Sequence, residues 1–287
     1  MQPTTLPLLG GDVHLLDSAT SGPPVLLLHD LDGCAAGWLD VTPGLAVDHR
    51  VLAPDLPGCG RSPVGRRRTS LTAHADLVAE VVRRRTDDPV TLVGNSVGAL
   101  VALLTAARHR WAVSSLVLLA PALPRRTAGG FDPAFLPLLT ASVVPGLLLL
   151  EPWRRSLQAP RERIDALMAA ACAPDSERAS PGTLEAMLEV EASRPRAQRL
   201  RGWPAAARSL FWWLARPERF HGLADAVDVP VWLVEGVQDP VLPRSTVLAA
   251  LERHPDWIHV PLAGVGHVPQ LERPAAVVDT VRSATGV

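Results

Sequence analysis

Short hydrophobic runs alternate with longer amphipathic segments along most of this chain. Uninterrupted Val- and Leu-rich runs of this length are typical of strands that are buried on both faces of a parallel sheet. We predict strands at residues 25–28, 51–53, 90–93, 116–120, 231–234 and 257–260. The pattern therefore predicts an α/β fold with a mostly parallel, doubly wound sheet.

Four segments between these runs have the apolar period of helices, at residues 70–85, 97–109, 244–254 and 274–283. The first segment is the clearest, because Leu71, Ala75, Val78 and Val82 form one apolar stripe. Thr69 or Ser70 can cap its start, and three arginines occupy the end that the helix dipole favours for positive charge.

The alternation stops between Pro121 and Asp228, where only amphipathic helical stretches with prolines are found. A segment of this length is too long for a plain loop, so we predict a helical lid over the sheet. The predicted domains are the first part of the core (1–120), the lid (121–228) and the second part of the core (229–287).

The predicted lid is rich in aromatic residues, since it holds all four phenylalanines and four of the eight tryptophans. These side chains either form the lid's own core or line an apolar substrate pocket, to which the apolar segment 135–150 would contribute. Trp212 and Trp213 are the pocket candidates. They are adjacent on a predicted helix and point about 100° apart, so we expect only one of them to face substrate.

Composition narrows the class of protein. A chain of 287 residues with 47% hydrophobic content can bury a large core, and a net charge of −1 argues against nucleic acid as a partner. We expect no transmembrane segment and no signal peptide, which favours a cytoplasmic location. Three widely spaced cysteines predict neither a zinc site nor a disulfide framework. We expect no metal and no cofactor, and nothing indicates an oligomeric state.

One hydroxyl interrupts two hydrophobic runs in TLVGNSVGALVALL, residues 91–104. Ser96 has a glycine two residues away on either side, as in the G-x-S-x-G turn that raises a nucleophile between a strand and a helix. A larger residue at Gly94 or Gly98 would collide with the adjoining strand or helix. Ser96 is therefore the candidate nucleophile, and it requires a base and an acid elsewhere in the chain.

Among the nine histidines, His267 has the most suitable setting, because it lies in a glycine-flanked loop just after a predicted strand. Asp239 lies in the loop after another strand and is the candidate acid. Glu235 is its rival, but it falls at the strand end and points away from the loop tip. The order Ser96, Asp239, His267 is that of α/β-hydrolases.

These residues carry a resemblance over nearly the whole chain. The chain resembles the lidded, esterase-like serine hydrolases of the α/β-hydrolase fold. The matching segments are VLLLHDLDG (25–33), Trp38, DLPGCGRS (55–62), GNSVG (94–98), EGVQDPVLP (235–243) and GVGHVPQLERP (264–274). The resemblance implies an oxyanion hole formed by the backbone amides of Leu31 and Val97. One position departs from the usual His-Gly pattern, because Asp30 follows His29.

Several other polar residues near these segments favour structural roles. We interpret Asp55 as the end of a strand that holds down a loop, and Cys59 as a small loop residue. His29 is expected to brace the oxyanion loop through a side-chain hydrogen bond. Glu272 is expected to stabilise a loop or cap a helix.

The sequence therefore predicts a serine hydrolase that cleaves a carboxylic ester with an apolar acyl or alcohol part, through an acyl-enzyme. The same three residues also serve C–C bond and thioester hydrolases, so these remain alternatives. A ligand receptor on a hydrolase scaffold is a third, disfavoured by the intact set of residues. A fluorophosphonate label separates enzyme from receptor.

Overall fold

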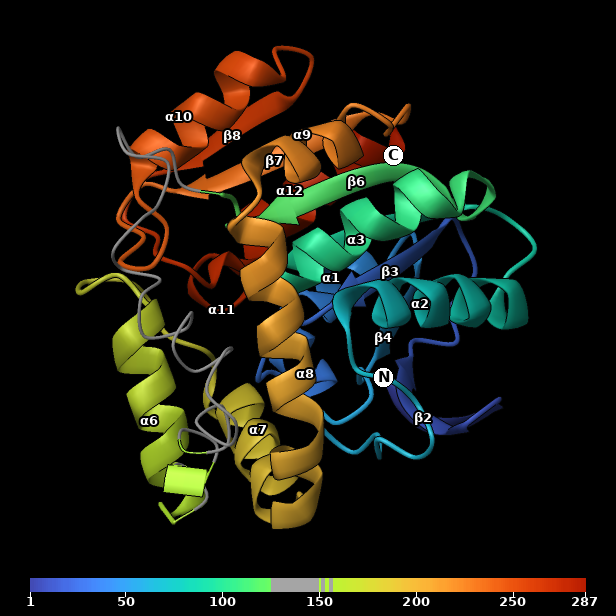
Figure 1. Cartoon of the computed structure of the whole chain (residues 1–287), viewed down its shortest axis with the longest axis vertical. Coiled ribbons are helices and arrows are strands. Elements are labelled where there is room, and N and C mark those ends of the chain that lie inside the picture. Colours follow the sequence, from blue (N-terminus) through green and yellow to red (C-terminus); the bar gives the residue numbers. More distant parts are fainter. Residues whose placement is uncertain (125–149, 151–152, 155–156) are drawn as a thin grey trace.

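The computed structural model describes residues 1–124, 150, 153–154 and 157–287. Its strands form one sheet in the order β1-β2-β4-β3-β5-β6-β7-β8 (Figure 1). The strands are β1 (Gln2–Leu8), β2 (Gly11–Asp17), β3 (Pro24–Leu28), β4 (Arg50–Pro54), β5 (Val90–Asn95), β6 (Val113–Leu119), β7 (Val231–Gly236) and β8 (Ile258–Leu262). From β4 to β8 all neighbours are parallel, which confirms the predicted mostly parallel sheet.

Helices connect these strands and form the lid. They are α1 (Thr42–Leu45), α2 (Leu71–Arg85), α3 (Val97–Arg108), α6 (Pro160–Ala171), α7 (Pro181–Ser193), α8 (Arg196–Leu214), α9 (Pro217–Ala224), α10 (Arg244–Arg253), α11 (Pro269–Glu272) and α12 (Pro274–Thr285). Two short 3-10 helices, Ala35–Trp38 and Arg110–Ala112, complete the described elements. Ser70 caps α2 as predicted, because its hydroxyl accepts a hydrogen bond from the Ala73 amide at 3.3 Å.

The sheet has a separate apolar core on each face. Buried side chains of α2, α3 and α10 pack on one face, and those of α1 and α12 pack on the other. Alternate residues of each central strand serve the two cores: Leu26 and Leu28 of β3 point to the first, and Val25 and Leu27 to the second. The sheet is therefore doubly wound, as predicted.

The antiparallel hairpin at the start of the chain was not predicted. Strands β1 and β2 pair across Gly10 and Gly11, which both have positive φ angles (94° and 141°). The signal was present in the sequence, because a Gly-Gly pair lies between two stretches with alternating apolar positions, Leu6 and Leu8 before it and Val13 and Leu15 after it.

The insertion between β6 and β7 is helical where the structure describes it. Helices α6, α7 and α8 lie together beside the sheet (Figure 1), and α6 and α7 share a small apolar core with residues of the sheet's loops. Residues 135–149 of the predicted apolar segment, with Phe131 and Phe135, lie outside the described residues. The boundaries 121–228 of the lid stay a prediction.

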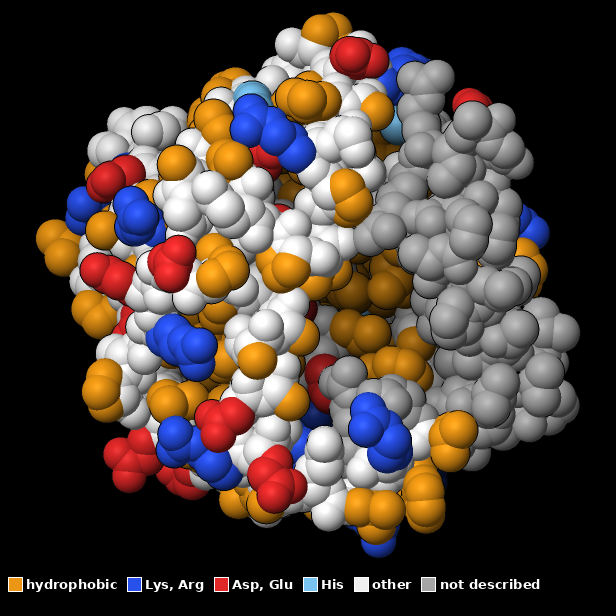
Figure 2. Space-filling model, turned by 90° about the vertical axis from the view of Figure 1, so that its left-hand side faces the viewer, with side chains coloured by type: hydrophobic (Ala, Val, Ile, Leu, Met, Phe, Trp, Pro, Cys, Tyr) orange, Lys and Arg blue, Asp and Glu red, His pale blue; other side chains and the backbone are white. Residues whose placement is uncertain are grey.

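No helix in the described part of the chain is long and apolar enough to cross a membrane. The face that carries α6 and α10 is hollowed near its centre, and hydrophobic side chains gather in the hollow (Figure 2).

Candidate active site

The turn between β5 and α3 places Ser96 at the end of a central strand. Ser96 has φ 53° and ψ −109°, an unusual conformation for a residue other than glycine. A Cβ at Gly94 would lie 2.5 Å from the Ala99 amide nitrogen, and a Cβ at Gly98 would lie 2.3 Å from the Leu28 carbonyl oxygen. Both glycines therefore let the turn pack against the adjoining helix and strand, which is the reason predicted for their spacing.

The structure brings the three predicted residues together in series. The Ser96 hydroxyl lies 2.9 Å from Nε2 of His267, and Nδ1 of His267 lies 2.7 Å from Oδ2 of Asp239. A carboxylate can only accept, so Nδ1 of a neutral His267 carries the proton and Nε2 is left to accept from the serine hydroxyl. This arrangement can remove a proton from Ser96.

Asp239 is held in place by its own loop. Its other oxygen, Oδ1, accepts hydrogen bonds from the amides of Val241 and Leu242 at 2.7 and 2.8 Å. The side chain is only 2% exposed. These bonds fix the carboxylate beyond the end of β7, where it meets His267.

The rival carboxylate, Glu235, has a different partner. It is 1% exposed on β7, and its Oε2 lies 2.8 Å from Nε2 of His259 on β8. Its second oxygen lies 3.5 Å from the guanidinium of Arg244. Glu235 therefore points away from His267, in agreement with the sequence interpretation.

The loop that carries His267 is anchored through its backbone. The His267 carbonyl accepts a hydrogen bond from the Asn95 side chain at 2.8 Å, and its amide donates to the Ala171 carbonyl at 2.7 Å. Asn95 is itself fully buried next to Ser96. The elbow, the histidine loop and the C-terminal end of α6 are therefore joined directly. Asn95 was not predicted from the sequence, where its only signal was a polar residue between two hydrophobic runs.

Glu272 stabilises the same loop from behind, as the sequence suggested. Its buried carboxylate accepts hydrogen bonds from the amides of Gly266 (2.9 Å), Val268 (3.2 Å) and Ala173 (2.8 Å). The first two amides flank His267, and the third follows helix α6. A buried carboxylate is well satisfied by several backbone donors, so Glu272 links the histidine loop to the lid.

The loop after β3 is braced by His29, as predicted. Nδ1 of His29 donates to the Asp30 carbonyl at 2.7 Å, and Nε2 accepts from the Leu56 amide at 3.0 Å. The structure places Leu31 in the wall of the cavity that also contains His267, and Val97 at the first position of α3 beside Ser96. The oxyanion hole formed by their amides stays a prediction.

Asp55 holds the two loops next to the site. It accepts hydrogen bonds from the amides of Ala35 (2.7 Å) and Arg61 (2.9 Å), and from Nδ1 of His14 (2.8 Å). Burial by itself raises the pKa of Asp55, but these hydrogen bonds, that of His14 first, outweigh it and hold the pKa below its usual value. This agrees with the structural role that the sequence favoured.

Cys59 shows the opposite behaviour. Burial raises the pKa of its thiol to about 12, against the opposing charge of Arg194. Its Sγ donates to the Leu31 carbonyl at 3.6 Å. A thiol with so high a pKa is a poor nucleophile, so Cys59 is a packing residue of the loop.

A cavity of about 380 Å³ opens beside His267. One wall is a face of α6 with the spacing of a helix, made of Arg163, Ile164, Ala166, Leu167, Ala170 and Ala171. Leu31, Val241 and Trp203 add apolar surface, whereas Asp30, Asp32, Arg154 and Glu191 add charge. The space next to His267 is therefore partly apolar and partly charged.

The structure does not bring Trp212 and Trp213 to this cavity. Trp213 is 6% exposed in the core shared with the sheet, and the Arg219 guanidinium lies 4.1 Å from its ring centre. Trp212 is 40% exposed beside Arg216. The tryptophan that lines the cavity is Trp203, on the same helix α8. Trp213 is therefore a core residue, which was one of the two roles considered for the aromatic residues of the lid.

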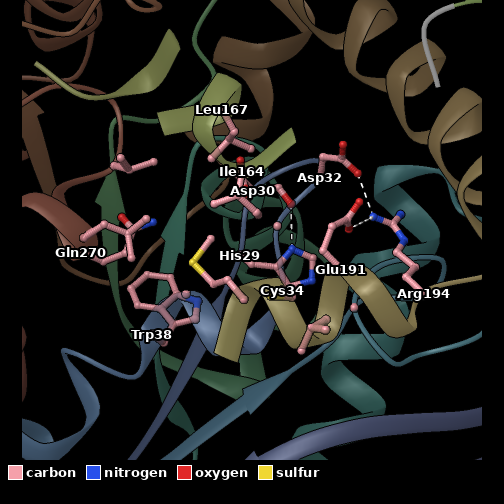
Figure 3. A pocket seen from close by; sticks show the side chains of 17 residues that line it. His29, Asp30, Asp32, Cys34, Trp38, Ile164, Leu167, Glu191, Arg194 and Gln270 are labelled. Carbon is pink, nitrogen blue, oxygen red and sulfur yellow. Dashed lines mark hydrogen bonds and ion pairs between the residues drawn. The ribbon is translucent and has the colours of Figure 1, made fainter. Parts of the chain in front are cut away.

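The charged residues of the lid form a buried network beside the cavity. Glu191 bonds to Arg163 and, at 2.9 Å, to Arg199; Arg194 lies 2.9 Å from Asp32 (Figure 3). The Arg194 and Arg199 side chains are only 2% and 3% exposed. Buried ion pairs of this kind need complementary partners, and here they join α7 and α8 to the loop after β3.

Among the described residues, no group of three or more His, Cys, Asp or Glu side chains is placed to hold a metal ion.

Comparison with known proteins gives the family. The chain matches the Alpha/beta hydrolase family over residues 25–280. It is similar to the pimeloyl-[acyl-carrier protein] methyl ester esterase of Aromatoleum aromaticum, with 30% identity over 255 residues that cover 88% of this chain and 94% of that one. This chain is a member of the Alpha/beta hydrolase family, and the predicted resemblance is confirmed.

Other matches are shorter or show the fold alone. An uncharacterized protein of Mycobacterium tuberculosis is 35% identical over 100 residues, which span 35% of this chain and 29% of that protein. A solved structure of a thermophilic esterase from Thermogutta terrifontis superposes with a TM-score of 0.72, at 22% identity, over 99% of this chain and 97% of that one. The likeness to the thermophilic esterase shows the fold alone, and the chain spans under a third of the length of the mycobacterial relative.

Proposed function

We propose that this chain is a serine hydrolase that cleaves a carboxylic ester through an acyl-enzyme. The observation that carries the proposal is the series of contacts from Ser96 through His267 to Asp239, at 2.9 and 2.7 Å. Nucleophile, base and orienting acid lie within hydrogen-bond reach of one another, as acyl transfer by a serine requires.

In the proposed first step, the Ser96 oxygen attacks the ester carbonyl while its proton passes to Nε2 of His267. Asp239 stabilises the imidazolium that forms. The amides of Leu31 and Val97 donate to the oxyanion, and one such donor is worth about 3 kcal/mol in the transition state. His267 then gives its proton to the leaving alkoxide, and the alcohol departs.

The second step releases the acid. Water attacks the acyl-enzyme, His267 takes one proton of that water, and the proton returns to Ser96 as the carboxylic acid leaves. Neither step requires a cofactor or a metal.

The esterase from Aromatoleum aromaticum supports an ester as the substrate, because that relative is matched over most of both chains. No contact in the described residues favours a thioester or a C–C bond. The cavity supports a small-molecule ester with an apolar part that packs on Ile164, Leu167 and Trp203. The charged side chains of the same cavity indicate that the substrate also carries a polar group.

The proposal is tested with Ser96→Ala, in which alanine fits wherever the turn accepts serine. We expect this variant to lose fluorophosphonate labelling and to lose at least about 10⁴-fold in kcat for a p-nitrophenyl ester, with an unchanged melting temperature. Retained hydrolysis would remove Ser96 from the mechanism. A wild-type protein that binds esters but is neither labelled nor active would support the receptor alternative.

A further inference from the structure

Asp30 stands next to the predicted oxyanion hole and has no role in the mechanism above. It follows His29, where the resemblance leads one to expect glycine, and it directly precedes Leu31. It lines the cavity that contains His267 and also a smaller adjoining cavity of about 40 Å³. Asp30 therefore borders the space beside His267 in which the proposed substrate would bind.

Within the part of the chain that the structure describes, the Asp30 carboxyl forms no ion pair, and its hydrogen-bond partner is its own backbone. The nearby cations are engaged elsewhere, since Arg194 pairs with Asp32 and Arg199 pairs with Glu191. Figure 3 shows Asp32 and Glu191 lying between Asp30 and Arg194, while Ile164 lies close to Asp30. Asp30 is half-buried, so an ionised carboxylate in this position would be only partly solvated and would have no paired counter-charge.

The position of the side chain is set by Gly33. A Cβ at Gly33 would lie 2.0 Å from Oδ1 of Asp30, so the Asp30 carboxyl occupies the space that any other residue at position 33 would fill. Gly33 does not have a positive φ angle, so backbone conformation does not require glycine here. Glycine leaves room for the Asp30 side chain. The loop is built around this carboxyl group.

The surroundings of Asp30 favour the neutral acid. Burial raises the pKa of Asp30 and the nearby charge of Asp32 raises it further, whereas a charge on His29 or His267 would lower it. The titratable and charged groups that line the two cavities around it are His29, Asp32, Cys34, Arg154, Arg163, Glu191, Arg194 and His267.

We propose that Asp30 is a specificity-determining residue whose neutral carboxyl group donates a hydrogen bond to an acceptor on the acyl chain, one or two carbons from the scissile carbonyl. The preferred substrates are then esters of oxo acids. The inference rests on the proposed function, because Leu31 binds the scissile carbonyl only if Ser96 attacks it. Asp30 and Leu31 are consecutive, so an acceptor close to that carbonyl is the one within reach of Asp30.

The test compares two esters of similar shape, ethyl 3-oxobutanoate and ethyl 3-methylbutanoate, by the ratio of their kcat/KM values. The 3-oxo ester is intrinsically more reactive, so the ratio of each variant is divided by that of the wild type. His267 serves both esters, and its titration therefore cancels in the ratio. The ethyl ester of β-alanine, which has an ammonium group at the same carbon, is the third probe.

Asp30→Ala removes the donor, and we expect the ratio to fall about tenfold, the value of one net hydrogen bond. Gly33→Ala displaces the carboxyl without removing it, and we expect a fall of similar size. Asp30→Asn keeps a neutral donor, so its ratio stays within about twofold of the wild type. Asp40→Asn changes a carboxylate that lines neither cavity and accepts hydrogen bonds from Ser180 and Thr183, and it leaves the ratio unchanged.

The pH dependence has a defined sign. The neutral acid exists below the pKa of Asp30, so the wild-type ratio is high at low pH and falls as the pH rises through that pKa. The ratio of Asp30→Asn stays flat over the same range. A structural role for Asp30 would not produce this difference.

Two results would overturn the proposal. A ratio unchanged in both Asp30→Ala and Gly33→Ala would show that the carboxyl does not meet the acyl chain. Selective loss of the β-alanine ester in Asp30→Asn would show an ionised carboxylate that binds a cation. If the wild type hydrolyses the esters and Ser96→Ala does not, the proposed function stands in either case.

Discussion

The molecule contains two histidine–carboxylate pairs on the same two strand–loop units, and only one of them contacts Ser96. Asp239 and His267 lie 2.7 Å apart in the loops after β7 and β8, whereas Glu235 and His259 lie 2.8 Å apart on the strands themselves. Both carboxylate side chains are at most 2% exposed. The two carboxylates are therefore alike in chemistry and burial, and their position relative to the ends of the strands separates them.

That position has a physical basis. In a parallel sheet the carboxyl ends of the strands meet at one edge, and side chains in the loops beyond that edge converge on a common crevice. Asp239 lies three residues beyond Gly236, the last residue of β7, whereas Glu235 is still within the strand. A residue within a strand points to one face of the sheet and is committed to packing there. Distance from the strand end is thus a better guide to a reactive residue than burial or pairing.

The largest expected effect comes from changing the two carboxylates separately. Asp239→Asn leaves His267 without the acceptor that fixes its tautomer, and we expect kcat for a p-nitrophenyl ester to fall about 10⁴-fold with the KM nearly unchanged. Glu235→Gln is the matched control, and its kcat should stay within about threefold of the wild type. Steady-state kinetics of the two variants shows which carboxylate, Asp239 or Glu235, serves His267.

The opposite outcome would reverse the comparison. A mild Asp239→Asn together with a severe Glu235→Gln would mean that the loop rearranges and that Glu235 serves His267.

A smaller effect is expected from the hydrogen bond by which the Asn95 side chain anchors the loop of His267. Asn95→Ala removes the hydrogen bond to the His267 carbonyl and frees the loop to shift. We expect a loss of roughly 10²-fold in kcat, as for a displacement of about 1 Å. Thr91→Val is the control. Thr91 lies on the same strand as Asn95, β5, and the change removes its buried hydrogen bond to Ser115 of β6, which is not part of the His267 loop.

Both variants should lose stability in urea titrations. Thr91→Val should lose about 1–3 kcal/mol for one broken buried hydrogen bond, and Asn95→Ala should lose more, because its side chain also donates to the Leu119 carbonyl and accepts from Gln270. Equal losses of activity in Asn95→Ala and Thr91→Val would show that the effect is general destabilisation, and that Asn95 does not position His267.

The smallest effect is expected on stability, from the Glu235–His259 pair on strands β7 and β8. Glu235→Gln and His259→Gln should each lower the free energy of unfolding, and a double-mutant cycle should give a coupling of about 1 kcal/mol or less, because the His259 side chain is 26% exposed. Urea denaturation measures it. A coupling of several kcal/mol would show that solvent does not screen this pair.

The parallel part of the fold was predictable because its signals are local. All six predicted strands and all four predicted helices occur, and the ends of the helix at residues 70–85 differ from α2 by a single residue. The antiparallel β1–β2 hairpin was missed although its Gly10–Gly11 turn was visible, since each of its strands alternates polar and apolar residues and has little continuous hydrophobic character. The lid was predictable as an interruption of the pattern.

Candidate site residues could be predicted where the local sequence leaves few alternative roles for a residue type. A serine between two glycines and a histidine in a glycine-rich loop are such cases. Asn95 and Trp203 were not found, because their roles depend on contacts with segments more than 100 residues away or on which face of a helix meets a cavity. Trp212 and Trp213 carried the same local signal as Trp203, and only the packing of α8 distinguishes them.

The contacts between the C-terminal end of α6 and the His267 loop, here called the joint, limit how freely the lid can be exchanged between related proteins by engineering. A Cβ at Gly266 would lie 2.5 Å from the Ala171 carbonyl oxygen, and the Ala173 amide donates to Glu272. A chimaera that receives the lid of a relative inherits a working base only if residues 171–173 still fit this loop. The lid of this hydrolase is therefore not an independent module, and the graft should be designed to carry both sides of the joint together.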